Sequence, residues 1–276
     1  MSINNVTGYS PPFINHKFFA FMLRLISLFA SLFLLMATLA QASTKPSDRL
    51  YEIRIYHPTP GKYAEIVDRF RQYTTKLFEK HGMENIGYWT PTDTSRKELI
   101  YILAYPDKAA RDASWKAFGS DPAWKEVVQK TEANGKLVAK VDQIFMKESD
   151  ISPKVRVRTK SPARTFEMRT YTATPGKLPN LLARFRDHTI KLFSKHGMTH
   201  IGYFLTTDPT APDESGQSRL VYFLAHDSEA AGKASFDMFR KDPNWVKSKD
   251  ESEKGGPITK KVESVYLVPT DYSPMK

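Results

Sequence analysis

A Glu-x-Arg-x-Tyr motif occurs twice in the chain and is the set of residues best suited to chemistry. The two copies are Glu52, Arg54 and Tyr56, and Glu167, Arg169 and Tyr171. A carboxylate beside a guanidinium can anchor an anionic or carbonyl ligand, and the carboxylate can act as a base. Structural ion-pair networks gather the same residue types, because buried charges need partners. The motif therefore predicts either a ligand anchor or a network that fixes how the chain packs.

A histidine precedes a glycine at matching places, as His81-Gly82 and His196-Gly197. Near a cavity such a histidine could carry a proton or bind haem iron axially. At the last turn of a helix it could instead complement the macrodipole as a cation. The chain contains no H-x-H spacing and no cysteine, and only the second copy has an H-x-x-x-H spacing, His196 to His200, so a zinc site, a disulfide and a thiol nucleophile are not expected.

Aromatic side chains offer further candidates. Tyr101 and Tyr222 alternate with leucines on apolar strands, where they could line a cavity or pack in a core. Trp115, Trp124 and Trp245 lie at helical positions, which favours packing anchors over an aromatic cage.

An internal duplication positions all these residues. Residues 51–89 recur as 166–204, with 21 of 39 positions identical, and residues 99–124 recur as 220–245. The second copy has gained six residues within 206–218, a polar segment typical of a long hairpin loop. A repeat of this size decides the architecture.

Each copy shows the same succession of elements. Residues 50–56 alternate as a strand that places Tyr51, Ile53 and Ile55 on one face and the motif on the other. Thr59-Pro60 predicts a helix N-cap followed by proline at N1, Gly82 ends the helix, and Asp121-Pro122 begins another. The resulting order, β-α-β-β-α-β, is the ferredoxin-like one.

The fold class expected is therefore α+β, with ferredoxin-like domains at 49–148 and 165–268 joined by a basic, proline-bearing linker at 149–164. A sheet with both helices on one face leaves the other face bare. We expect the two bare faces to pack together as one closed barrel able to hold a small ligand. The alternation places the motif on these bare faces, so both Glu/Arg pairs are expected to enter a shared interior.

Residues 1–42 resemble a signal peptide. Lys17 and Arg24 precede an apolar run at 25–39, and Ala40-Gln41-Ala42 provides a cleavage site. The run is short for a membrane span, although an uncleaved anchor is the alternative. Met22 offers a second, more compact start. We expect a mature chain without a transmembrane span, in the periplasm or secreted.

The formal charge of +11 is spread along the chain rather than gathered in one stripe, so a nucleic-acid partner is not expected. The sequence has no G-x-G-x-x-G, P-loop or G-x-S-x-G motif. Nucleotide cofactors and hydrolase triads therefore have no support.

The combined pattern YE(I/L)R-x-Y, TPGK, HGM, GYW, Y-x-LAY and DP-x-W resembles the NIPSNAP family of the dimeric α+β barrel superfamily. The resemblance covers both halves and implies a barrel-forming binding or scaffold protein of mostly unassigned chemistry. Relatives with the same barrel include haem-degrading oxygenases, quinone-forming monooxygenases and chlorite dismutases. Departures between the halves, Trp89 to Phe204, Trp115 to Phe236 and Tyr105 to His226, argue against strict two-fold equivalence.

These observations predict an exported protein that binds a small, partly apolar ligand in a pseudo-dimeric barrel, with or without catalysis. One alternative is a monooxygenase-like enzyme, either cofactor-independent or dependent on haem, and another is a protein-interaction module. No cofactor is predicted beyond that haem alternative. A homo-oligomer is left open.

Overall fold

The computed structural model describes residues 49–207 and 219–276. The first repeat consists of β1 (Leu50–Pro58), α2 (Tyr63–Arg69), η1 (Phe70–Thr74), α3 (Thr75–Lys80), β2 (Glu84–Pro91), β3 (Leu99–Tyr105), α4 (Lys108–Ser120), α5 (Pro122–Thr131) and β4 (Val138–Glu148). The second consists of β5 (Thr165–Ala173), α6 (Leu178–Arg184), η2 (Phe185–Thr189), α7 (Ile190–Lys195), β6 (Thr199–Thr206), β7 (Arg219–His226), α8 (Glu229–Lys241), α9 (Pro243–Ser252) and β8 (Thr259–Pro269). The predicted β-α-β-β-α-β order is confirmed in both repeats.

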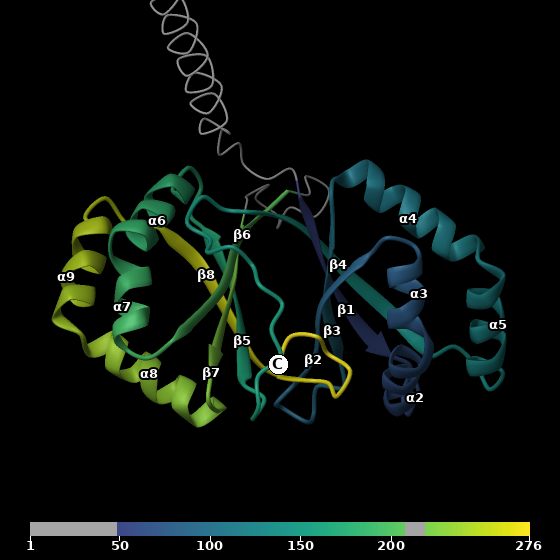
Figure 1. Cartoon of the computed structure of the whole chain (residues 1–276). Helices are drawn as coiled ribbons and strands as arrows, with labels where there is room; N and C mark the ends of the chain where they lie inside the picture. Colours follow the sequence, from purple (N-terminus) through teal and green to yellow (C-terminus); the bar gives the residue numbers. More distant parts are fainter. Residues whose placement is uncertain (1–48, 208–218) are drawn as a thin grey trace, which may run out of the picture. The chain divides into compact units, whose positions relative to one another are not determined.

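The strands of the described residues close into one barrel in the order β1-β3-β2-β8-β5-β7-β6-β4. Each repeat contributes four antiparallel strands, and two short seams join the repeats (Figure 1). At one seam Thr90 of β2 pairs with Val268 of β8, and at the other Lys147 of β4 pairs with Leu205 of β6. The predicted single barrel built from both repeats is therefore confirmed.

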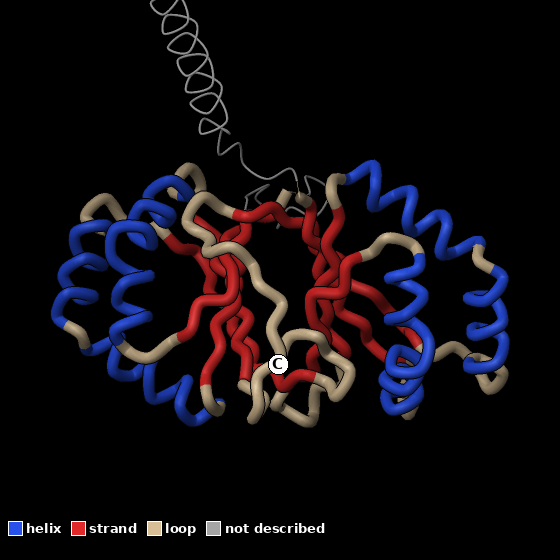
Figure 2. Tube along the Cα trace, viewed as in Figure 1, coloured by secondary structure: helices blue, strands red, loops and turns tan. Residues whose placement is uncertain are grey.

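The barrel divides the apolar side chains into three clusters. Two clusters lie between a repeat's own helices and its own sheet, and the third, drawn from both repeats, fills the barrel interior. Figure 2 shows the helices on the outside of the strands in each repeat. In the interior, Tyr51 packs against Phe204 with ring centroids 4.9 Å apart, and the matching pair Trp89 and Phe166 lies at 5.4 Å. These aromatic pairs connect one repeat to the other.

The face assignment of the Glu-x-Arg-x-Tyr motif is wrong. The interior is lined by the opposite, apolar face of β1 and β5, which includes Tyr51, Ile53 and Phe166. Glu52 contacts Arg111 and Trp115 of α4, so the motif lies between the sheet and its helices. The physical reason is that the partner sheet covers the bare face, which must then be apolar, while cationic and aromatic side chains from a helix reach the other face.

Two local predictions about the helices have different outcomes. Thr59-Pro60 does not cap α2, because Lys62 N donates to Thr59 O at 2.8 Å and Gly61 has a φ of 82°. These residues make a tight turn, and the helix begins only at Tyr63. Gly82 does end the helix, with a φ of 74°. Asp121 caps α5, since its Oδ1 accepts from Ala123 N at 2.9 Å.

A π-helical turn interrupts the first helix of each repeat, which the sequence pattern did not predict. It spans Phe70–Thr74 in one repeat and Phe185–Thr189 in the other. In both, a threonine hydroxyl at the end of the turn donates to the carbonyl five residues earlier, from Thr74 to Arg69 and from Thr189 to Arg184. The repeated hydrogen bond makes this turn a built feature of both copies.

The predicted signal peptide at 1–42 lies outside the described residues. Among the helices that are described, none is long and apolar enough to cross a membrane.

Candidate functional site

A cavity of about 610 Å³ lies between the two repeats, where β1 and β5 end and β4 and β8 begin. We call it the mouth pocket; its wall consists of Ile55, Arg96, Asp142, Gln143, Ile144, Met168, Thr170, Arg219, Glu263, Ser264 and Val265. Much of the wall comes from equivalent positions of the repeats, such as Ile144 with Val265 and Asp142 with Glu263. Both copies therefore contribute matching residues to the pocket.

The floor of the mouth pocket is apolar. Ile55, Ile144 and Val265 are partly buried and pack on the interior cluster, and Met168 belongs to that cluster with 8% of its surface exposed. The inner part of the barrel is filled by packed side chains, and the mouth pocket lies at one end of this interior. An apolar floor below an open mouth suits the apolar part of a small ligand.

The rim of the pocket is charged, with both signs present. Arg96 Nη2 lies 2.7 Å from Glu98, and Asp142 contacts both Lys140 at 2.7 Å and His57 Nε2 at 2.7 Å. Burial opposes ionisation of Asp142, but the hydrogen bonds from Lys140 and His57 hold its pKa below the ordinary value. Asp142 is therefore an ionised carboxylate at neutral pH.

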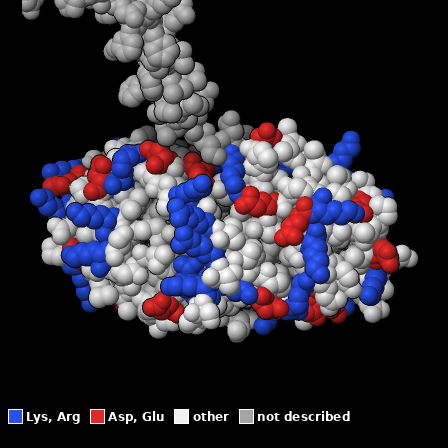
Figure 3. Space-filling view, viewed as in Figure 1, with Lys and Arg blue, Asp and Glu red and all other residues white. Residues whose placement is uncertain are grey.

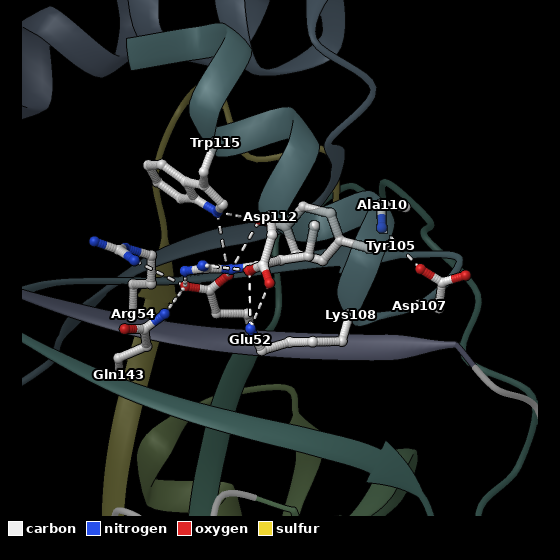
Figure 4. A network of polar contacts seen from close by, with 10 residues as sticks. Glu52, Arg54, Tyr105, Asp107, Lys108, Ala110, Asp112, Trp115 and Gln143 are labelled. Carbon is white, nitrogen blue, oxygen red and sulfur yellow. Dashed lines mark hydrogen bonds and ion pairs between the residues drawn. The ribbon is translucent and has the colours of Figure 1, made fainter.

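Glu52 lies at the centre of a closed polar cluster on the other side of the sheet (Figure 4). Arg111 donates to both carboxylate oxygens at 2.9 Å, and Arg54 Nη1 and Gln143 Nε2 donate at 2.8 and 2.5 Å. Tyr105 and Trp115 complete the shell at 3.2 and 3.3 Å. Burial alone would raise the pKa of Glu52, but Arg111 and Arg54 hold it below its ordinary value.

Glu167 forms the matching cluster in the second repeat with different partners. Arg169 Nη1 donates at 2.6 Å, Ser264 Oγ donates at 2.5 Å, and His226 Nε2 lies 3.2 Å from the carboxylate. Burial again opposes ionisation, and His226, Arg169 and Ser264 together hold the pKa of Glu167 below its ordinary value. Neither glutamate is exposed to solvent or faces the mouth pocket. The geometry therefore favours the structural interpretation of the motif.

The two predicted histidines connect helices. His81 Nε2 lies 2.7 Å from Asp121, and His196 Nε2 lies 2.8 Å from Asp242. Each aspartate caps the next helix and also pairs with a lysine, so its pKa is well below the ordinary value. This arrangement ties the end of one helix to the start of another, and it does not place either histidine at the mouth pocket.

The predicted tyrosines also lie on the helix side of the sheets. Tyr101 stacks on Tyr88 with centroids 5.3 Å apart, and Tyr222 stacks on Tyr203 at 5.2 Å. Both are fully buried, and Tyr56 and Tyr171 pack on them in turn. Of the two alternatives left open for Tyr101 and Tyr222, the structure shows packing in the core rather than lining of the barrel cavity.

Sequence reasoning missed the pocket residues Asp142 and Glu263. Asp142 and Ile144 alternate along β4 on the interior face, as do Glu263 and Val265 along β8. The available signal was an acidic residue at the same position of the last strand of each repeat, two residues before an apolar residue that faces the interior.

Within the described ranges, no cluster of three or more His, Cys, Asp or Glu side chains is arranged to hold a metal ion. The haem alternative needs a histidine with a free ring nitrogen facing a cavity. His81 and His196 direct Nε2 at aspartates, and no histidine belongs to the wall of the mouth pocket. The described residues therefore do not fit an axially bound haem at this pocket.

Comparison with known proteins identifies one family and several solved structures that match the chain. The NIPSNAP family model matches residues 51–153 and again 166–274. No curated protein matches the chain.

Three solved structures match the chain over different lengths. A candidate monooxygenase from Lactobacillus acidophilus NCFM matches with a TM-score of 0.52 and 11% identity, over 80% of this chain and 93% of its own. An anthrone oxidase-like protein matches at 0.55 and 10%, over 83% and 94%. A NIPSNAP-like domain protein from Burkholderia xenovorans matches at 0.36 and 19%, over 40% and 93%. At such low identities the first two show the fold alone.

Proposed function

The chain belongs to the NIPSNAP family, in two tandem copies, and from this premise we propose that it is an exported protein that binds a small, partly apolar ligand in the mouth pocket. The single observation that carries the proposal is the 610 Å³ cavity, lined by both repeats, with an apolar floor and a charged rim. Pockets of roughly 300–1,000 Å³ with an apolar lining and a few polar groups are typical small-molecule sites.

The floor supplies the affinity expected for an apolar group. Ile55, Ile144 and Val265 remain partly exposed at the end of an otherwise packed interior. Covering about 100 Å² of such surface would contribute about 2.5 kcal/mol. The ligand's apolar part therefore enters first, toward the interior cluster.

The rim supplies orientation rather than net charge. The wall of the pocket contains Arg96 and Arg219 together with Asp142 and Glu263, so the formal charges of these four side chains cancel. A strongly anionic or cationic ligand gains no net attraction from such a rim. The polar end of the ligand is therefore neutral or zwitterionic and lies among hydrogen-bonding groups of both signs.

A binding function without catalysis is favoured because the two motif glutamates, the candidate bases predicted from the sequence, do not face the pocket. Glu52 and Glu167 lie on the far side of the sheet, and their oxygens are filled by arginine, glutamine, serine and histidine donors. A carboxylate held at a lowered pKa by arginines is a weak base. The monooxygenase alternative rests on structures that share only the fold.

Filling the pocket tests the proposal. Val265→Trp places an indole over the floor, while Val262→Trp places the same group at a 46% exposed position of the same strand. With the neutral apolar fluorescent probe N-phenyl-1-naphthylamine, V265W should lose most of the saturable binding, and V262W should bind as the wild type does. Equal binding by wild type and V265W would exclude the mouth pocket as the site.

Two further measurements separate the remaining parts of the proposal. N-terminal sequencing of the protein recovered from the cell envelope or the medium should show a chain that starts after Ala42, and an intact leader would contradict export. Adding haem and recording a Soret band would support the haem-dependent alternative instead.

A further inference from the structure

A second pocket lies under the linker between the repeats, and its wall is strongly basic. This cavity of about 320 Å³ is lined by Lys154, Arg156, Arg158 and Arg164 from the linker, and by Thr199 and His200 among the residues of β6. No acidic residue belongs to its wall. We call it the linker pocket.

The basic residues follow the chain with a period of two. Lys154, Arg156, Arg158 and Lys160 alternate with Val155, Val157 and Thr159. Val155 packs on the interior cluster, which fixes the direction of this extended segment. In an extended chain alternate residues point the same way, so the cationic side chains share one side. Figure 3 shows a strip of Lys and Arg across the middle of the face that the linker crosses.

These cations have few partners of their own. The side chains of Lys154, Arg156 and Arg158 make no hydrogen bond or ion pair with any residue that the structure describes. The one acid of the linker, Asp150, is occupied by Arg186 at 2.5 Å. Residues 149–164 contain five basic residues and one acidic one, which leaves a formal charge of 5 − 1 = +4.

One arginine of the pocket is held in place. Arg164 donates through Nε and Nη2 to the Lys276 carbonyl at 3.3 and 3.2 Å, and it lies over the Phe166 ring at 5.2 Å. Burial and the nearby charge of Arg158 lower the pKa of Arg164. Like charges are therefore brought together here, and no acidic side chain belongs to the pocket wall, which is an arrangement that a bound anion stabilises.

We propose that the linker pocket binds a phosphate-type dianion, either a soluble phosphomonoester or the phosphate of an anionic lipid headgroup. Several cations around one concave site match a doubly charged ligand better than a single carboxylate. Guanidinium groups donate bidentate, charge-assisted hydrogen bonds to phosphate oxygens. The volume exceeds that of phosphate itself and leaves room for the group that carries it. This site is separate from the mouth pocket, and neither depends on the other.

Titration calorimetry of the full chain tests the proposal with inorganic phosphate and glycerol phosphate, at constant ionic strength. The variant Arg156→Gln/Arg158→Gln removes two exposed side chains that hold no other group. Lys116→Gln/Lys125→Gln, on the exposed surface of α4 and α5, removes the same charge elsewhere. Binding should weaken at least about tenfold in the first variant and stay unchanged in the second.

Sedimentation with vesicles of phosphatidic acid, a lipid whose headgroup is a phosphomonoester, and phosphatidylcholine distinguishes the two sources. Capture that requires Arg156 and Arg158, without binding of the soluble phosphates, would identify the ligand as a lipid headgroup. The reverse pattern would identify a soluble phosphomonoester. No saturable binding of either kind, or equal losses in both double variants, would overturn the proposal.

Discussion

The two buried glutamate clusters occupy equivalent positions in the repeats but neutralise their carboxylates differently. Glu52 has two permanent cations, Arg54 and Arg111. In the second repeat Gly232 stands at the position of Arg111, and His226, in place of Tyr105, supplies the second contact to Glu167.

The replacement of Arg111 by Gly232 is coupled to packing. A β-carbon at Gly232 would lie 2.9 Å from both the His226 and the Tyr266 rings. Glycine at position 232, in place of the arginine, therefore leaves the space that the His226 and Tyr266 rings occupy. Both copies therefore keep the buried glutamate and its neighbouring arginine. The helix residue, Arg111 or Gly232, and the strand residue, Tyr105 or His226, differ together between the copies.

The largest difference between the clusters should appear on neutralising the glutamates. Glu52→Gln removes the carboxylate that Arg54 and Arg111 share and leaves Arg111 with only its exposed contact to Asp112 at 3.1 Å, which should lower the free energy of unfolding by about 3–5 kcal/mol. Glu167→Gln leaves Arg169 alone as a permanent cation, because a histidine can be neutral, and should cost about 1–3 kcal/mol. Urea denaturation of both variants measures the difference. Equal losses of unfolding free energy in the two variants would show that the additional arginine, Arg111, does not make the Glu52 cluster more sensitive.

The packing part of the comparison is tested by a pair of glycine substitutions. Gly232→Ala should lower the free energy of unfolding by about 1–3 kcal/mol, because the added carbon meets two rings at 2.9 Å. Gly119→Ala, in the equivalent type of helix but with nothing within 4 Å, should raise it by up to about 1 kcal/mol. Thermal unfolding followed by circular dichroism compares the two. A stabilising G232A would mean that the rings are free to move aside.

A smaller effect is expected in acid, and it has the same sign in both clusters. The folded-state pKa of Glu52 and of Glu167 is lower than the ordinary 4.5, so each contributes stability that is complete above pH 4.5. That stability is lost as the pH falls through the folded pKa, by at most about 1.4 kcal/mol per pH unit for each group. The free energy of unfolding, measured by denaturation between pH 5 and pH 2, should therefore fall less steeply with decreasing pH for E52Q/E167Q than for the wild type. An unchanged slope would place the acid sensitivity in other carboxylates.

Much of the fold could be predicted because the relevant signals are local or repeated. The glycine at the end of α3 and the Asp121-Pro122 start of α5 are local signals that act within a few residues, and both are confirmed. The duplication is a repeated signal, and the two copies have the same order of elements. The pairing of two bare sheets followed from the same repeat, and the closed barrel confirms it.

The site could not be predicted to the same extent, because alternation reveals two faces but not which one points inward. In β1 both faces are buried, one by the second repeat and one by the helices. The partner that settles the question, Arg111, lies 59 residues beyond Glu52 in the sequence. No local pattern reports a contact over that distance. The pocket acids at 142 and 263 were missed for a related reason, since charged residues were assigned to the wrong face.

Native mass spectrometry of the full chain, purified without denaturation, tests the central claim that the mouth pocket holds a ligand. We expect the wild type to retain a small molecule that dissociates on activation, V262W to retain it equally, and V265W to have lost it. A retained molecule of unchanged occupancy in V265W, or a wild type that never carries one and binds no apolar probe, would contradict the account.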